Sequence, residues 1–319
     1  MPRPDLPVSG PGVATPADIE AINRLFSEAF TDRYQRDGMA GVRVPCLNPK
    51  VWRYALGDAG EGAMVWRDPE GGIAAFNIAH LSGAEGWMGP LAVRPGLQDR
   101  GVGTAIVSAG LRWLQAHGAR TIGLETMPRT VGNIGFYSRL GFLPGHLTVT
   151  VSREAGPRGP GAGDRLSLAA GSRDRLMAAC AALTDRLRPG VDFRREIEVT
   201  AALGLGDTTL LREGDRLRGF ALWHGEPLAA GRGSEELRVL KLVAEDLESF
   251  RRLIRALQAE AAAERLPRVS VRAQTAFAEA YGALVDAGFR VHWTDLRMTL
   301  RGAGEPRPGA GVVFSNWEI

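Results

Sequence analysis

The chain has 319 residues, of which 45% are apolar and 24% charged, with a formal net charge of +3. This length favours two domains over one core, and the apolar fraction is that of a globular rather than a disordered protein. No long apolar run predicts a membrane span, no block of like charges predicts a nucleic-acid surface, and residues 1–12 lack the apolar core of a secretory signal. We therefore expect a cytoplasmic protein that binds neither membranes nor nucleic acid.

The two cysteines are interpreted as ordinary thiols. Cys46 and Cys180 lie in different halves of the chain, and neither belongs to a Cys-x-x-Cys or Cys/His cluster. This pattern predicts no disulfide framework and no structural metal. The small positive net charge is compatible with an anionic cofactor.

Helix and strand patterns alternate along the first half of the chain. Ile19, Ile22 and Phe26 recur at helical spacing and predict the first helix. Gly89-Pro90 interrupts a later strand and predicts a bulge there. The other expected elements are, in order, a helix over 48–56, strands over 63–66, 73–81 and 87–93, a helix over 101–117, a strand over 121–125, a helix over 133–140 and a strand over 147–151.

Residues 154–164 are dense in Gly and Pro and predict an interdomain linker. After it a similar order returns, with strands expected over 217–223 and 238–243, a helix over 247–266, a strand over 268–272 and a helix over 277–285. Placing Gly288-Phe289 over Gly141-Phe142 also aligns these later elements with the earlier ones. We therefore predict two related domains, at 1–153 and 165–302.

The remaining residues, 303–319, form a tail in the predicted organisation. Residues 312–317 contain an apolar stretch that predicts a strand. This strand is expected to complete a sheet or to cap the cleft between the two domains.

The most informative stretch is a loop and helix start around Gly101 and Gly103. The free amides and partial positive charge of a helix N-terminus stabilise an anion, and glycines let the backbone approach phosphate oxygens. The pattern is not a dinucleotide-binding fingerprint, because Ile106 stands where a third glycine would be needed, and Gly-Lys-Ser/Thr of the P-loop is absent. These residues therefore suit a pyrophosphate that is bound neither as in a dinucleotide-binding fold nor as in a P-loop.

Three segments in this order resemble the GCN5-related N-acetyltransferases. Gln98-Asp99-Arg100-Gly101-Val102-Gly103 is similar to the pyrophosphate signature Gln/Arg-x-x-Gly-x-Gly/Ala, residues 91–95 to the bulged strand before it, and residues 133–142 to the later Asn-x-x-Ala-x-x-Phe-Tyr-x-x-x-Gly-Phe region. The resemblance covers residues 15–151 well and the second half only as a similar fold. It implies an α+β protein of two tandem domains, each with a mixed, mostly antiparallel twisted sheet flanked by helices.

The same resemblance implies acetyl-CoA as co-substrate, without a metal, and a set of site residues. Main-chain groups of Leu91 and Val93 are expected to pair with the pantetheine arm, and Asn133 to contact it. The Tyr137 hydroxyl is expected to protonate the leaving thiolate. The complete expected cofactor site is Leu91, Ala92, Val93, Gln98, Asp99, Arg100, Gly101, Val102, Gly103, Thr104, Asn133 and Tyr137, with Arg94, Arg100 and Arg139 as candidates for the 3′-phosphate.

Transfer to an amine also requires a base, because an amine with a pKa near 10.4 is mostly protonated at neutral pH. Glu85, just before the bulged strand, is the base that we select, with Glu125 on the next strand as the alternative. Both are expected to face the cleft. His80 could also line it, although a lone histidine on a strand is usually structural.

The second half lacks the signature, because residues 244–248 place three carboxylates at the helix start and Leu284 stands where Tyr137 would align. It is therefore expected to bind no CoA. The sequence predicts an acetyl-CoA-dependent N-acetyltransferase acting on a primary amine, most simply of a small molecule, by direct attack in a ternary complex. Acetylation of a protein N-terminus or lysine, and a non-catalytic acyl-CoA-binding module, are the alternatives. A monomer or a homodimer is expected.

Overall fold

The computed structural model describes residues 7–156, 163–169 and 171–318. Most of the predicted linker, from residue 157 to residue 162, lies outside the described residues. No helix in the described ranges is long and apolar enough to cross a membrane. Cys46 and Cys180 are both free thiols, as predicted.

The first half contains the predicted alternation of helices and strands. Its elements are β1 (Ser9–Val13), α1 (Ile19–Arg36), α2 (Pro49–Ala59), β2 (Ala63–Arg67), β3 (Ile73–Ser82), β4 (Glu85–Val93), α3 (Val102–Ala116), β5 (Thr121–Thr126), α4 (Val131–Arg139) and β6 (Phe142–Glu154), with short 3-10 helices η1 (Pro16–Asp18), η2 (Gly60–Gly62) and η3 (Pro95–Leu97). Strand β1 has no counterpart among the sequence-based expectations. The expected strand at 147–151 is the middle of the longer β6.

The second half repeats this order in outline. Its elements are β7 (Asp164–Arg165), η4 (Leu166–Leu168), α5 (Arg173–Leu187), α6 (Arg194–Leu203), β8 (Gly206–Glu213), β9 (Arg216–His224), β10 (Leu237–Ala244), α7 (Leu247–Ala263), β11 (Arg268–Gln274), α8 (Ala278–Asp286), β12 (Arg290–Leu300) and β13 (Val312–Ser315). The sequence patterns predicted β9, β10, α7, β11, α8 and β13. They did not predict α5, α6, β8 or β12.

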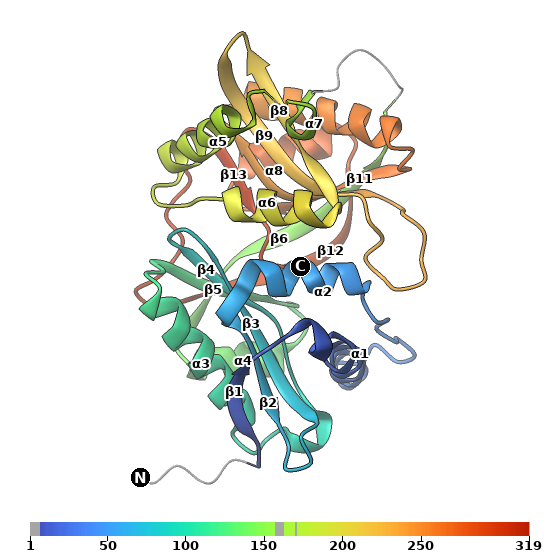
Figure 1. The fold of residues 1–319 in the computed structure, drawn as a ribbon, viewed down its shortest axis with the longest axis vertical. Helices are drawn as coiled ribbons and strands as arrows, with labels where there is room; N and C mark the ends of the chain where they lie inside the picture. The colour runs from blue at the N-terminus through green and yellow to red at the C-terminus, as the bar shows by residue number, and fades with distance from the viewer. Residues whose placement is uncertain (1–6, 157–162, 170, 319) are drawn as a thin grey trace.

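All strands in the described ranges belong to one mixed sheet that runs through both halves (Figure 1). Its order is β1-β2-β3-β4-β5-β12-β6-β11-β10-β9-β8-β7, and β13 also pairs with β10. Strand β12 of the second half lies between β5 and β6, and β6 of the first half lies between β12 and β11. The two halves therefore exchange their last long strands. One continuous sheet runs through both predicted domains, 1–153 and 165–302, so it marks no boundary between them. These boundaries therefore stay predictions.

The exchanged strands also contribute to the cores of the opposite halves. Val149 and Val151 of β6 pack in a buried cluster with Val269 and Val271 of β11. Met298 of β12 is fully buried in a cluster of first-half residues around α3 and β5. The exchange explains why only one strand follows Phe142 in the first half. The strand missing from its sheet comes from residues 290–300.

Helix α3 packs closely against strand β3, and this contact fixes the position of the N-terminus of α3. A Cβ at Gly110 would lie 2.5 Å from Asn77 Nδ2 and 2.6 Å from Met88 Sδ, so only glycine allows the approach. The Asn77 amide donates a hydrogen bond of 2.9 Å to the Ile106 carbonyl inside the helix. The apolar face of α3 is buried through Ile106, Val107 and Leu114.

Candidate active site

Strands β4 and β5 separate in the middle of the sheet. They pair in parallel from Glu85 opposite Thr121 to Met88 opposite Leu124, and the pairing stops there. At Gly89-Pro90 the register between β4 and β3 shifts, which confirms the predicted bulge. Residues 91–93 continue to pair with β3 but have no partner on the β5 side. The sheet therefore opens toward the carboxyl end of β5.

The main chain of β4 offers hydrogen-bonding groups to this opening. Arg94 N–H donates to the Ala74 carbonyl at 2.9 Å, which makes this a hydrogen-bonded pair of the antiparallel β3–β4 ladder. Because hydrogen-bonded pairs alternate along such a ladder, the main-chain groups of Leu91 and Val93 point away from β3. The Gln98 side chain donates to the Val93 carbonyl at 3.2 Å. These are the two residues whose main chain was expected to bind a pantetheine arm.

Helix α3 begins at the edge of the same opening. Gly101 is its N-cap residue, has a φ of 81° and gives no side-chain cap. The N–H groups of the first turn, Val102 to Thr104, therefore have no acceptor within the helix or from the cap. Gly103 faces α4, because a Cβ there would lie 3.2 Å from Phe136 Cζ. This is the geometry of an anion site at a helix N-terminus.

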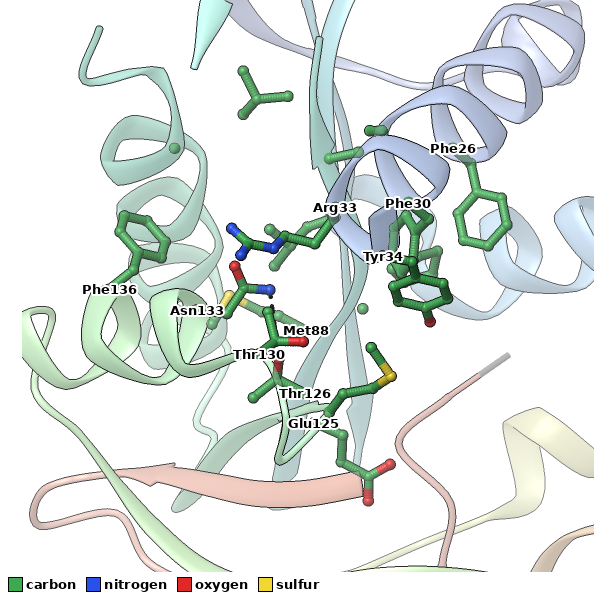
Figure 2. A pocket seen from close by; sticks show the side chains of 18 of the residues that line it. Phe26, Phe30, Arg33, Tyr34, Met88, Glu125, Thr126, Thr130, Asn133 and Phe136 are labelled. Atoms are coloured by element: carbon green, nitrogen blue, oxygen red, sulfur yellow. Dashed lines mark hydrogen bonds between the residues drawn. The ribbon is translucent and has the colours of Figure 1, made fainter. Parts of the chain in front are cut away.

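A cavity of about 770 Å³ joins these features (Figure 2). The expected cofactor residues that line it are Leu91, Ala92, Val93, Gln98, Asp99, Gly101, Gly103, Thr104, Asn133 and Tyr137. Of the other two, Arg100 is exposed and Val102 is fully buried, and neither side chain lines the cavity. The structure brings this set to one place, and its role in binding stays a prediction.

Helix α4 supplies the polar side chains of one wall. Tyr137 is 7% exposed, and its ring lies edge-on to Phe142 at a centroid distance of 6.1 Å. Burial raises the pKa of Tyr137 above its usual value, so its hydroxyl keeps its proton at neutral pH. Asn133 Nδ2 lies 3.5 Å from Thr126 Oγ1 (Figure 2). A protonated phenol in this position suits a proton donor.

The expectation that Glu85 faces the cleft is corrected by the structure. Its side chain is fully buried outside the cavity lining, and it pairs with Arg188 at 2.6 Å. It also accepts hydrogen bonds from the Ser315 hydroxyl and from Trp317 Nε1, the latter at 3.0 Å. Although burial raises the pKa of a carboxyl group, Arg188 and Lys241 hold the pKa of Glu85 below its usual value. Glu85 anchors the C-terminal segment, and we do not propose it as the base.

The alternative base, Glu125, does line the cavity, but two arginines hold it. Its carboxylate pairs with Arg272 at 2.5 Å and with Arg297 at 2.7 Å, and accepts from Thr148 Oγ1. Although burial raises the pKa of a carboxyl group, the two arginines lower the pKa of Glu125. A carboxylate so strongly stabilised in its charged form is a poor proton acceptor.

The remaining first-half candidates are structural or remote. His80 is buried outside the cavity lining, stacks on Trp87 at 3.8 Å and lies 2.5 Å from the Asp58 carboxylate. Arg94 donates to Asp68 at 2.7 Å and to the Ile73 carbonyl, and so braces the β2–β3 turn. Among the three arginines considered for the 3′-phosphate, Arg139 lines the cavity.

The sequence patterns did not predict the part of the cavity wall that comes from α1, β12 and the C-terminal segment. These lining residues are Phe26, Phe30, Arg33, Tyr34, Trp293, Asp295, Trp317 and Glu318. The apolar alternation of Leu296, Met298 and Leu300 could have revealed β12. No local pattern, however, indicates that this strand joins the sheet of the first half. The C-terminal segment behaves as expected of the tail, because β13 completes the sheet and the residues after it border the cavity.

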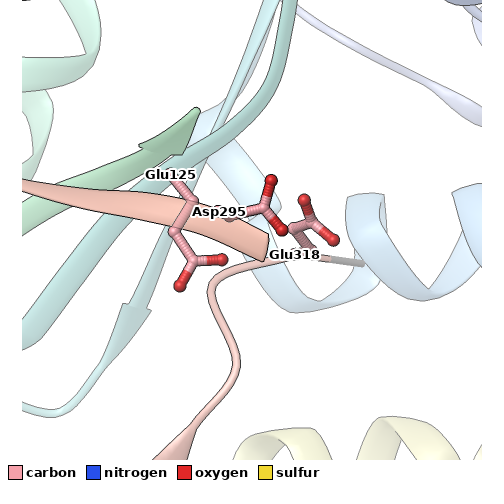
Figure 3. Close-up of side chains that lie close together, drawn as sticks. All are labelled: Glu125, Asp295 and Glu318. Atoms are coloured by element: carbon pink, nitrogen blue, oxygen red, sulfur yellow. The ribbon is translucent and has the colours of Figure 1, made fainter. Parts of the chain in front are cut away.

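Three carboxylates from distant parts of the chain meet at this wall (Figure 3). Oxygens of Glu125, Asp295 and Glu318 lie within 4.8 Å of one another. Arg272 pairs with all three, at 2.5, 3.0 and 2.8 Å respectively. Because this guanidinium already provides a shared positive charge, we interpret the cluster as an ion-pair network rather than a metal site.

The corresponding helix start in the second half is arranged differently. The N-cap of α7 is Asp246, whose carboxylate accepts from Ser249 N–H at 2.7 Å. Arg218 pairs with Asp246 and with the neighbouring Glu245. This helix N-terminus is therefore satisfied by the chain's own carboxylates, and the expectation that the second half binds no CoA stays a prediction.

A split sheet edge, an uncapped helix N-terminus and a cavity lined by a buried tyrosine are the features that the sequence resemblance led us to expect of a site for a CoA thioester. Residues 19–142 match the model of the Acetyltransferase (GNAT) family. The family comprises acyl-CoA-dependent N-acyltransferases. A comparison with curated proteins gives no match.

Solved structures extend the likeness over both halves. A GCN5-related N-acetyltransferase from Sphaerobacter thermophilus is 16% identical, covers 96% of this chain and 97% of its own, and has a TM-score of 0.60. A tandem GNAT protein from the clavulanic acid biosynthesis pathway is 13% identical over 90% of this chain and 96% of its own, with a TM-score of 0.58. N-myristoyltransferase of Saccharomyces cerevisiae with bound myristoyl-CoA is 11% identical over 94% and 79%, with a TM-score of 0.63. At these identities the likeness shows the fold, and the predicted α+β architecture of two related halves is confirmed.

Proposed function

We propose that the protein is an acetyl-CoA-dependent N-acetyltransferase that transfers an acetyl group to a primary amine of a small molecule, by direct attack in a ternary complex. The observation that carries this proposal is the continuity of the cavity. One space borders the free main-chain edge of β4, the uncapped N-terminus of α3 and the hydroxyl-bearing Tyr137. A CoA thioester needs all three surfaces: the helix N-terminus for its pyrophosphate, the strand edge for the pantetheine arm that follows, and the tyrosine beside the sulfur at the end of that arm.

The residues present suit each part of that co-substrate. The pantetheine arm would add to the edge of β4 at Leu91 and Val93 as an extra strand. The pyrophosphate would receive N–H groups from residues 102–104 together with the positive end of the α3 dipole. Tyr137 would stand near the sulfur, because it lines the same cavity and lies about one helical turn from Asn133 on α4.

The reaction then requires few chemical groups from the protein. The neutral amine attacks the thioester carbonyl carbon, a C–N bond forms and the C–S bond breaks. Tyr137 donates its proton to the leaving thiolate, and the acylated nitrogen loses one proton to solvent, from which the Tyr137 phenolate is protonated again. A main-chain N–H at the bulge near Val93 would stabilise the oxyanion.

The preference for a small acceptor is supported by the walls of the cavity. Its end beyond β5 is bordered by the C-terminal segment at Trp317 and Glu318, by β12 at Trp293, and by Leu228 and Ala229 of the second half. An acceptor that enters from this side has to fit among these residues.

The proposal is tested by binding and turnover together. Titration calorimetry should detect CoA binding, and thiol release from acetyl-CoA should appear with at least one amine of a broad panel. Tyr137→Phe should lower kcat by about 10²-fold and leave the Kd for CoA unchanged. Tyr281→Phe, on the matching helix α8 of the second half, is the control and should keep full activity. Absence of CoA binding overturns the enzyme assignment, and binding without turnover of any amine points to an acyl-CoA-binding module.

A further inference from the structure

The end of the cavity beyond β5 differs in character from the part expected to hold CoA. We call it the acceptor end and define it by Phe30, Tyr34, Trp293, Asp295 and Glu318. Its aromatic and acidic residues come from α1, β12 and the C-terminal segment, which lie far apart in the sequence. What it can bind rests on the proposed function, since an acceptor has meaning only beside an acyl donor.

One side of the acceptor end is a continuous aromatic wall. The ring centroids of Phe26 and Phe30 are 4.4 Å apart, those of Phe30 and Tyr34 are 6.2 Å apart, and those of Tyr34 and Trp293 are 6.3 Å apart. The first three rings project from one face of α1 toward the cavity (Figure 2). Trp293 keeps 38% of its surface exposed although it is a large apolar residue. Such a wall favours an apolar or aromatic body, and its ring faces also favour a cation.

The other side carries an excess of negative charge. Glu125, Asp295 and Glu318 share Arg272, while Arg297 divides its charge between Glu125 and Glu305. Asp295 is 2% exposed and accepts a hydrogen bond from Trp293 Nε1 at 3.1 Å. Glu318 is the open member of the group, with 47% of its side chain exposed. One guanidinium, Arg272, cannot neutralise all three carboxylates. A cationic ligand would compensate the negative charge that remains.

Glu318 is also held in a defined position. The Asn316 side chain accepts a hydrogen bond from Glu318 N–H and donates one to its carbonyl, both at 3.1 Å. Arg272 Nη1 lies 2.8 Å from its carboxylate. The segment before it is fixed because Trp317 donates to the buried Glu85. A carboxylate braced in this way can present one oxygen to a ligand at low entropic cost.

We propose that the acceptor is a primary amine carried on an aromatic or other apolar body, bound as an ammonium ion against Glu318 and Asp295, and that Glu318 removes its proton. The N–H bond of the ammonium breaks and the proton moves to the Glu318 carboxylate. The freed electron pair on nitrogen forms the bond to the thioester carbon, and the C–S bond electrons leave on sulfur, which Tyr137 protonates. The acylated nitrogen then loses its second proton, which restores the Tyr137 hydroxyl. Overall, ammonium and acetyl-CoA give the acetamide, CoA thiol and one proton, which Glu318 returns to solvent.

The environment of Glu318 supports this role. Partial burial of its side chain beside the cavity, together with the close negative neighbours Asp295 and Glu125 and despite the pairing with Arg272, raises the pKa of Glu318 to about 8. Tyr34 is the titratable group that faces it from α1, and burial together with Glu318 and Asp295 raises the pKa of that phenol. A base with a pKa near the working pH accepts a proton well and releases it again.

The first test compares amines at fixed acetyl-CoA. 2-Phenylethylamine should exceed putrescine, glucosamine and glutamic acid in kcat/KM by at least about 10-fold, since only it fills the aromatic wall. Trp293→Ala should raise KM for 2-phenylethylamine several-fold and change that for methylamine little. A protein that binds CoA and acetylates the sugar or the diamine best would overturn this inference and leave the proposed function standing. Absence of CoA binding would instead remove both.

The second test concerns the proton. Glu318→Gln should lower kcat/KM by about 10²-fold at pH 7.5 and leave the Kd for CoA unchanged. In the wild type, kcat/KM should rise through about pH 8 as the Glu318 carboxyl loses its proton. The variant should lose this rise and recover activity only as the free amine accumulates near pH 10. Glu279→Gln, an exposed glutamate of α8, is the matched control. Equal activity and equal pH profiles of the two variants would overturn the assignment.

Discussion

At the scale of single residues, Gly123 of β5 shows how closely the C-terminal segment is fitted to the first half. A Cβ at this position would lie 2.2 Å from Cζ3 and 2.5 Å from Cη2 of Trp317. The Trp317 ring is also covered by the Arg297 guanidinium, whose Cζ lies 3.5 Å from its centroid. The glycine therefore creates the space in which this tryptophan lies, and through it the position of Glu318 is set.

Gly123→Ala should accordingly displace the segment. Overpacking of this kind costs about 1–3 kcal/mol of the free energy of unfolding, measurable by urea denaturation. Thiol-release activity should fall with it, while the Kd for CoA should change little, because Gly123 does not line the cavity. Gly282→Ala on α8, where nothing lies within 4 Å of the added Cβ, is the control. Wild-type stability and activity in Gly123→Ala would contradict this account.

At the scale of elements, helix α3 combines a buried apolar face with an open N-terminus. Gly101 at the start and Gly118 after the end have nearly the same φ, 81° and 82°. Both positions favour glycine because this left-handed region strains other residues. Only Gly101 lies on the cavity.

Substitutions at Gly101 and Gly118 can therefore separate an effect on the stability of the protein from an effect on CoA binding. Gly101→Ala and Gly118→Ala should each cost about 1 kcal/mol of stability or slightly more. Gly101→Ala should in addition weaken CoA binding about 10-fold, because the strained turn shifts the N–H groups that we propose hold the pyrophosphate. Calorimetric titration of both variants checks this. Equal CoA affinities would show that the α3 N-terminus does not bind the diphosphate.

The elements also show what could be predicted from the sequence. The helix start at Gly101 and the bulge at Gly89-Pro90 are local patterns, and each was predicted. The position of Glu85 was not, because its partners Ser315 and Trp317 lie more than two hundred residues away. Asp295 and Glu318 were missed for the same reason, since nothing near them in the chain indicates the cavity they border.

At the scale of the whole molecule, the exchange of β6 and β12 makes each half dependent on the other. Without β12, the first half would leave an edge of β5 and an edge of β6 unpaired and would expose the apolar surface around Met298. Unpaired edges and exposed cores of this size are typical of aggregating fragments.

A chain of residues 1–156 alone should therefore be insoluble or bind no CoA. Co-expression of residues 1–156 with residues 163–319 as a second chain should restore a soluble complex that binds CoA, since the interleaved strands can pair between chains. Size-exclusion chromatography followed by calorimetry measures both outcomes. A soluble, CoA-binding fragment 1–156 would show that the exchanged strand is dispensable.

The strand exchange also bears on how the protein is made. Domains of most multidomain chains fold in the order of their synthesis, the N-terminal one first. Here the sheet that carries the diphosphate loop cannot close until residue 300 has left the ribosome, because β12 fills the gap between β5 and β6. The residues that are translated first therefore cannot complete their sheet until almost the entire polypeptide has been synthesised. An incompletely translated product would carry the full pyrophosphate signature and yet have no finished site.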